Sequence, residues 1–180
     1  VDGGAGSDEL AATLAAATTV RPTLANVELL DLDFTAAADL DLRNATGVTS
    51  VELEYSAAPT IENAASTLTS ITIDEATANT DNLAVDYAAS SDSAVTITVG
   101  GSDTDADNDV AVSVGDITVT DNAGALTITT TGEADNAIDA VTANDAASIT
   151  LNANTMGLTQ TGALSATSAT AASFTATADD

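Results

Sequence analysis

The chain has 180 residues, with 28 acidic side chains against two basic ones, Arg21 and Arg43, and its formal net charge is −26 at pH 7. It contains no Lys, His, Cys or Trp. So little positive charge cannot neutralise phosphates, which argues against nucleic acids and anionic membrane surfaces as partners. Without His or Cys there is no imidazole base, no thiolate nucleophile and no soft metal ligand. The chemistry that remains is that of carboxylates, either as glycosidase-like acid pairs or as oxygen ligands for Ca²⁺ and Mg²⁺.

The hydrophobic residues are mainly small or β-branched. They make up 44% of the chain, but aromatic residues are only 2%. No stretch approaches the roughly 20 consecutive apolar residues of a membrane span, so membrane insertion is not expected. Small side chains bury little area each, which favours a thin, regular stack over a thick core. High charge with few aromatics is also typical of disorder, and a chain that is disordered without a cation stays open as the alternative.

The N-terminal segment lacks the features of a signal peptide. Val1–Gly4 has neither a basic nor an apolar region, so the sequence is expected to begin inside a processed or longer protein. The Ala/Leu run 11–17 has helix propensity but is too short for a stable helix, so we expect a connector or one or two helical turns. Residues 1–25 are therefore separated from a strand-rich domain at 26–180.

After residue 26 the chain alternates between apolar and polar residues, as β-strands do. In segment 27–34, Leu30, Leu32 and Phe34 share one face, and Asp31 and Asp33 share the other. The same pattern recurs at 39–42, 51–55, 71–73, 83–87, 95–99, 110–114, 117–119, 126–129 and 149–151. The fold class is therefore predicted to be all-β.

Most strands start about 10 to 12 residues apart, separated by clusters of Asn, Asp, Gly and Ser. A parallel β-solenoid with about two strands per coil fits this spacing, because neighbouring coils stack like residues into a narrow core. An antiparallel β-sandwich is the alternative, but it usually has a large buried aromatic residue and Asn-Gly or Asp-Gly hairpins. We therefore favour the solenoid, whose open ends need caps or neighbours.

Residues 3–10 read Gly-Gly-Ala-Gly-Ser-Asp-Glu-Leu, one full match to the calcium-binding nonapeptide G-G-x-G-x-D-x-U-x. In this repeat the glycines form tight turns that present carbonyl groups to the ion, and the Asp supplies a carboxylate. The candidate ligands are Asp2, Gly4, Gly6 and Asp8. A complete site takes ligands from two successive turns, so one copy supplies about half. The alternative is an ordinary surface turn.

A second candidate calcium site is the acidic run at 103–109, flanked by glycines 100 and 101. It places alternating carboxylates on one side of a loop, and its candidate ligands are Asp103, Asp105, Asp107 and Asp109. It is no EF-hand, because it lacks Gly at position six, Glu at position twelve and flanking helices. A solvated acidic loop is the alternative. Further candidate ligands are Asp121 with Asn122 and Asp135 with Asn136.

Paired carboxylates also occur along the predicted strands, as in Glu52 with Glu54. A glycosidase needs two acids across a cleft, aromatic platforms for the sugar and a raised pKa on one acid. This chain has almost no aromatic residues, and alternating acids on a strand are usually a solvated face. We therefore expect no enzymatic activity.

Together, segments 3–10, 24–32 and 38–53 resemble the β-rich repeat regions of RTX-type surface-layer proteins and related giant exoproteins of Gram-negative bacteria. This resemblance covers residues 3 to about 55 and is only compositional beyond. It implies type I secretion, a calcium-dependent fold and assembly into a lattice or filament at the cell surface. The chain departs from the family in having one nonapeptide and no C-terminal secretion region, which leaves the number of calcium sites open.

These observations lead to a functional hypothesis. The chain is expected to be an extracellular structural segment that binds Ca²⁺ and associates with copies of itself in a bacterial surface layer or filament. The alternatives are a calcium-dependent adhesin module, with a cell-surface polysaccharide as its partner, or the stalk of a larger secreted protein.

Overall fold

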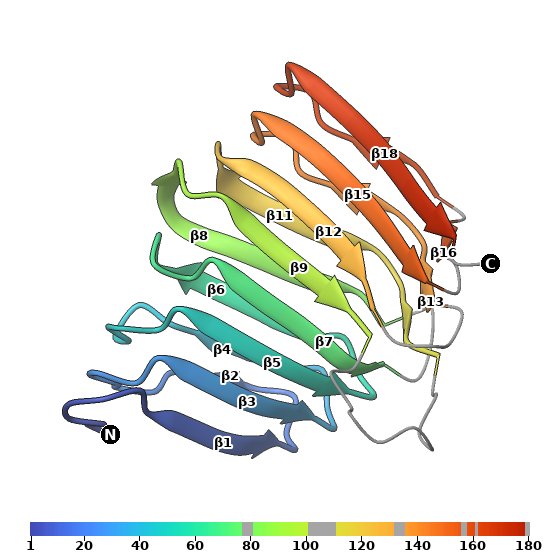
Figure 1. Ribbon diagram of the computed structural model, residues 1–180. Helices are drawn as coiled ribbons and strands as arrows, with labels where there is room; N and C mark the ends of the chain where they lie inside the picture. Colours follow the sequence, from blue (N-terminus) through green and yellow to red (C-terminus); the bar gives the residue numbers. More distant parts are fainter. Residues whose placement is uncertain (77–80, 101–110, 132–135, 156–157, 161, 179–180) are drawn as a thin grey trace.

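The computed structural model describes residues 1–76, 81–100, 111–131, 136–155, 158–160 and 162–178. Within these residues the secondary structure is all-β, and every strand pair is parallel. The chain winds as a β-solenoid whose sheets face each other across a thin interior (Figure 1). This confirms the predicted solenoid. The sandwich alternative is wrong, because a sandwich would require antiparallel pairs.

The largest sheet contains eight strands, one from each successive coil. In spatial order these are β1 (Glu9–Leu14), β3 (Leu29–Phe34), β5 (Ser50–Tyr55), β7 (Ser70–Ala76), β9 (Val95–Val99), β12 (Ala125–Thr130), β15 (Ser148–Thr155) and β18 (Ala171–Ala178).

The opposite sheet contains seven shorter strands, and a third sheet of three strands joins in the C-terminal half. The seven are β17 (Leu164–Ser165), β14 (Val141–Thr142), β11 (Ile117–Asn122), β8 (Leu83–Ser91), β6 (Thr60–Ala64), β4 (Asp39–Asp41) and β2 (Thr19–Val20). The three are β10 (Ser113–Val114), β13 (Asn136–Ile138) and β16 (Leu158–Gln160).

The length of one coil can be read from the strand register. Glu9 pairs with Leu29, Leu29 with Ser50, and Ser50 with Ser70, so the first coils repeat every 20 or 21 residues. This matches two predicted strand spacings per coil. The step is longest between Val95 and Leu126, 31 residues apart, where the chain includes the acidic run and strand β10.

The interior consists of rows of apolar residues stacked in register. One row passes through seven coils as Leu10, Leu30, Val51, Ile71, Ile97, Ile128 and Leu151. All of them are buried except the partly buried Leu10. The alternation predicted for 27–34 is confirmed, since Leu30, Leu32 and Phe34 are buried. Such ladders give each coil a matching neighbour, which is how small side chains fill a narrow core.

The Ala/Leu run is not helical. Residues Glu9–Leu14 form strand β1, which pairs along its whole length with β3. Register with Leu29–Phe34 supplies hydrogen bonds that an isolated short helix could not match, so tertiary pairing overrides the helix propensity of alanine. Hydrogen bonding therefore continues across residue 25, and the division of the chain at that residue remains a prediction about motifs.

Candidate functional site

The nonapeptide turn is held by the second coil. The carboxylate of Asp2 accepts hydrogen bonds from the Gly4 amide at 3.2 Å and from the Asn26 side-chain amide at 3.0 Å. Gly4 has φ +94° and Gly6 has φ +138°. These left-handed conformations confirm that the motif's glycines are needed for the backbone path.

Asp8 has one carboxylate oxygen without a partner. Its amide donates to the Glu28 carboxylate at 2.9 Å, and its carbonyl accepts from the amides of Glu28 and Leu29. Its Oδ2 atom is buried and makes no hydrogen bond, an arrangement that normally carries a desolvation cost. A bound cation would remove that cost, so the turn fits a calcium ligand at Asp8. Among the described residues, however, no group of three acidic side chains is placed to hold a metal ion.

The acidic run with Asp103, Asp105, Asp107 and Asp109 lies outside the described residues, as does Asp135. The two asparagines suggested as further ligands are described, and both bind the backbone. The side-chain oxygen of Asn122 accepts from the Gly124 amide at 2.7 Å. That of Asn136 accepts from the Val112 amide at 2.9 Å. Both are buried, so their role in the structure is to satisfy backbone groups between strands.

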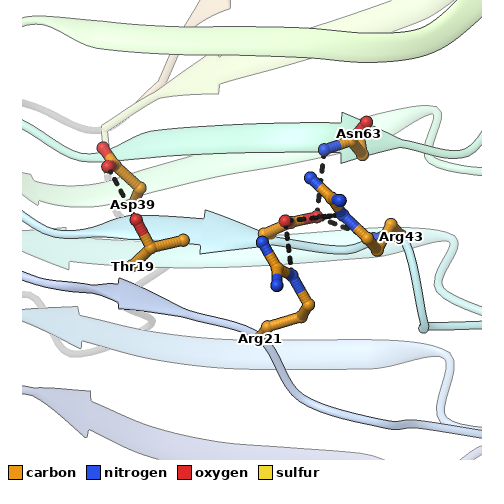
Figure 2. Close-up of polar contacts among 6 residues, drawn as sticks. Thr19, Arg21, Asp39, Arg43 and Asn63 are labelled. Carbon is orange, nitrogen blue, oxygen red and sulfur yellow. Dashed lines mark hydrogen bonds and ion pairs between the residues drawn. The ribbon is translucent and has the colours of Figure 1, made fainter.

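Both arginines converge on one carboxylate, a feature not expected from the sequence. Arg21 Nε and Arg43 Nε each lie 2.7 Å from Oδ2 of Asp41, and the Asn63 side chain donates to its Oδ1 at 3.0 Å (Figure 2). We call Arg21, Asp41, Arg43 and Asn63 the Asp41 cluster. The sequence signal is their spacing, because Arg21, Asp41 and Asn63 are about one coil apart.

The Asp41 cluster is covered by its own side chains. Asp41 follows the inward-facing Leu40 on β4, so it belongs to the outer face, yet its side chain has no exposed area. The two arginines above it remain about half exposed, at 46% and 51%. Their guanidinium groups, Arg43 first, hold the pKa of Asp41 well below its usual range. The pKa of Arg43 is raised in return. The cluster links three coils and leaves both arginines committed to one anion.

Acidic side chains stack on the outer face of the large sheet. The register pairs Asp31 with Glu52 and Asp33 with Glu54, and the next strand, β7, adds Asp74 and Glu75. We call these six residues the acidic ladder. Burial, followed by the charge of Asp74, raises the pKa of Glu52, and burial with the charge of Glu75 raises that of Glu54. The paired acids thus share an outer sheet face, and the expected absence of catalysis stays a prediction.

The first and last coils have hollows lined by apolar side chains. At the first coil a hollow of about 300 Å³ lies between β1, β2 and the leucines of the next coil. It arises where Ala12 occupies the interior row continued by Leu32, Leu53 and Ile73. At the last coil a smaller hollow is lined by Ile149, Leu164 and alanines.

Comparison with known proteins gives no assignment. No protein-family model, curated protein or solved structure matches the chain. The resemblance to RTX-type repeat regions therefore remains a prediction. Within the described part of the chain, no helix has the length and apolarity needed to cross a bilayer.

Proposed function

We propose that this solenoid is a structural segment that associates end to end with copies of itself. The observation that carries the proposal is where apolar surface is left uncovered. Among the side chains that the structure describes, the exposed large hydrophobic ones are Val1, Val20 and Leu164, and all three lie in the first or last coil. Val20 is on β2 and Leu164 on β17, the two edge strands of the seven-stranded sheet.

The edge strands supply the means of association. In the described chain, β1 and β2 pair with other strands on one side only, and so do β17 and β18. An unpaired edge presents amide and carbonyl groups that accept another strand. Because one end differs from the other, contact between them is head-to-tail and does not close on itself, which produces filaments. Stacking β2 of one copy on β17 of another would also cover Val20 with Leu164.

Charge explains why association would depend on calcium. Each copy has a formal charge of −26, so approaching copies repel one another. Divalent cations bound to carboxylates, with Asp2 and Asp8 beside the first coil as candidates, would lower this repulsion. The proposed setting is the extracellular surface of a bacterium, in a layer or filament, as the resemblance to RTX-type repeats implies.

The mass of the intact chain, measured by light scattering in EDTA and in millimolar Ca²⁺, tests the proposal. Calcium should produce oligomers that sodium chloride of equal ionic strength does not. Val20→Lys places a charge on the edge and should keep the chain monomeric. Ala84→Lys makes the same charge change on an outward position in the middle of the same sheet, and it should leave assembly intact.

Two results would overturn self-association. One is a chain that stays monomeric at all calcium concentrations, which would favour the adhesin alternative. The other is equal assembly by the wild type and Val20→Lys, which would place the contact away from the first coil.

A further inference from the structure

The outer face of the large sheet changes character from one half to the other. Beyond the acidic ladder, the outward positions of β7, β9, β12 and β15 hold short, uncharged polar residues in two rows. The strand register aligns Ser70, Thr96, Thr127 and Thr150 in one row, and Thr72, Thr98, Thr129 and Asn152 in the other. We call these eight residues the threonine array. The strands that carry it lie side by side in the front layer of Figure 1.

The array is held by a packed interior. On each strand its members alternate with buried residues, as Thr96 and Thr98 do with Val95, Ile97 and Val99. β-branched threonine has a stiff χ1 angle, and neighbours on adjacent strands restrict it further. The hydroxyl and methyl groups are therefore presented in a fixed pattern.

The pattern has two regular periods. Neighbouring strands are about 4.8 Å apart, and outward positions on one strand are about 6.6 Å apart. The array therefore approximates a rectangular lattice of groups that both donate and accept hydrogen bonds. The opposite sheet has no comparable double row, since the residues paired with Thr118 and Thr120 of β11 on β8 are Ala84 and Asp86.

Charge restricts what this face could bind. No member of the array is charged, in a chain of formal charge −26 whose acidic ladder occupies the neighbouring part of the same sheet. A cationic ligand would be drawn to the ladder, and an anionic one would be repelled by the chain. The complementary occupant is neutral, extended in two dimensions and regular, with both hydrogen-bond donors and acceptors.

We propose that the threonine array binds the surface of ice. Water in ice is neutral and is both donor and acceptor, and the oxygens on the prism face of ordinary ice repeat on a rectangle with edges of similar length. Threonine hydroxyls would take lattice positions, while the methyl groups between them would order the contacting water. A single dissolved sugar chain repeats in one direction only and would match one row.

The test uses the intact chain fused to a fluorescent protein, in calcium, with the fluorescent protein alone as reference. Incorporation into a growing ice hemisphere and thermal hysteresis are measured. The wild type should enter the ice and produce hysteresis, and the reference should be excluded. Thr98→Tyr and Thr129→Tyr, which project a ring from the middle of the array, should abolish both effects.

Two further variants separate the face from the fold. Thr118→Tyr, on the outward side of β11, should retain both effects. Thr129→Ser keeps the hydroxyl and removes only the methyl group, so it should reduce hysteresis with an unchanged circular dichroism spectrum.

Three outcomes would overturn the proposal: exclusion of the wild type from ice, equal loss in Thr118→Tyr, or wild-type hysteresis in both Thr129 variants. If the wild type is excluded from ice but forms dimers that Thr98→Tyr dissociates, the array pairs copies of the chain instead. Val20→Lys should still bind ice, so failure of end-to-end association leaves this inference standing.

Discussion

At the scale of single residues, Asp39 and Asp41 show how position decides the role of a carboxylate. Both lie on the outer face of β4, two residues apart. Asp39 accepts one hydrogen bond, from the Thr19 hydroxyl at 3.2 Å, whereas Asp41 is enclosed by two guanidinium groups and an amide (Figure 2). The two residues therefore form a matched pair for mutation.

Asp41→Asn is expected to lower the melting temperature at pH 7, because it leaves both arginines without their counter-charge. The pKa of Asp41 is lowered in the folded chain from a reference value of 3.8. The stabilisation is therefore complete above pH 3.8 and is lost as the pH falls toward the folded value. Thermal melts at several pH values should show a difference between wild type and variant that shrinks below pH 3.8.

Asp39→Asn is the control and should melt close to the wild type across the same pH range. Equal destabilisation by the two variants would mean that the Asp41 cluster has no special role.

At the scale of strands, parallel register gives the acidic ladder its electrostatic cost. Stacking places Glu52 beside Asp31 and close to Asp74, and like charges directly opposite on a sheet are destabilising. Burial and these neighbours raise the pKa of Glu52 above 4.5, so its ionised form disfavours folding at neutral pH.

Glu52→Gln should therefore stabilise the fold at pH 7, by roughly 0.2–1 kcal/mol for one cross-strand pair. The sign follows from the raised pKa: the penalty exists above the folded pKa and disappears as the pH falls to 4.5. Chemical denaturation at pH 7 and pH 4 should show a gain at the first pH and none at the second.

Glu62→Gln is the same substitution on β6, where the carboxylate interacts favourably with Arg43. It should not stabilise the chain. A gain as large as that of Glu52→Gln would indicate a general effect of reducing the net charge.

At the scale of the whole molecule, a thin core must offset the repulsion of many carboxylates. The interior rows bury mostly Leu, Ile and Val, with Phe34 stacked in register on Tyr55. Cations that bind the folded chain add their binding free energy to its stability. The orphaned Oδ2 of Asp8 is the described atom best suited to such a ligand.

Millimolar Ca²⁺ is therefore expected to raise the melting temperature of the chain above its value in EDTA, with Mg²⁺ and NaCl at matched ionic strength as references. Asp8→Asn should remove part of the calcium-specific rise. Asp92→Asn changes an exposed loop carboxylate and should keep it. Identical β content and melting temperature in EDTA and in Ca²⁺ would refute a calcium-dependent fold.

The sequence was most informative where structure depends on local periodicity. Alternation in segments such as 29–34 predicted both the strands and their buried faces, and the spacing of strands predicted the coil. It was least informative at β1, β2, β14 and β17, because two-residue strands have no measurable period and alanine favours helix when isolated. The glycines of the nonapeptide were predicted because the left-handed conformation is a property of one residue.

By itself, the sequence determined that this chain is an acidic, all-β stack of short strands with a calcium-type turn, because composition and alternation act within one strand. Only the tertiary structure decided which residues meet across coils. Arg21 reaches Asp41, Glu52 lies beside Asp31, and Thr98 aligns with Thr129. These contacts depend on the register between strands 20 to 31 residues apart, and a shift of one residue would turn each side chain to the opposite face.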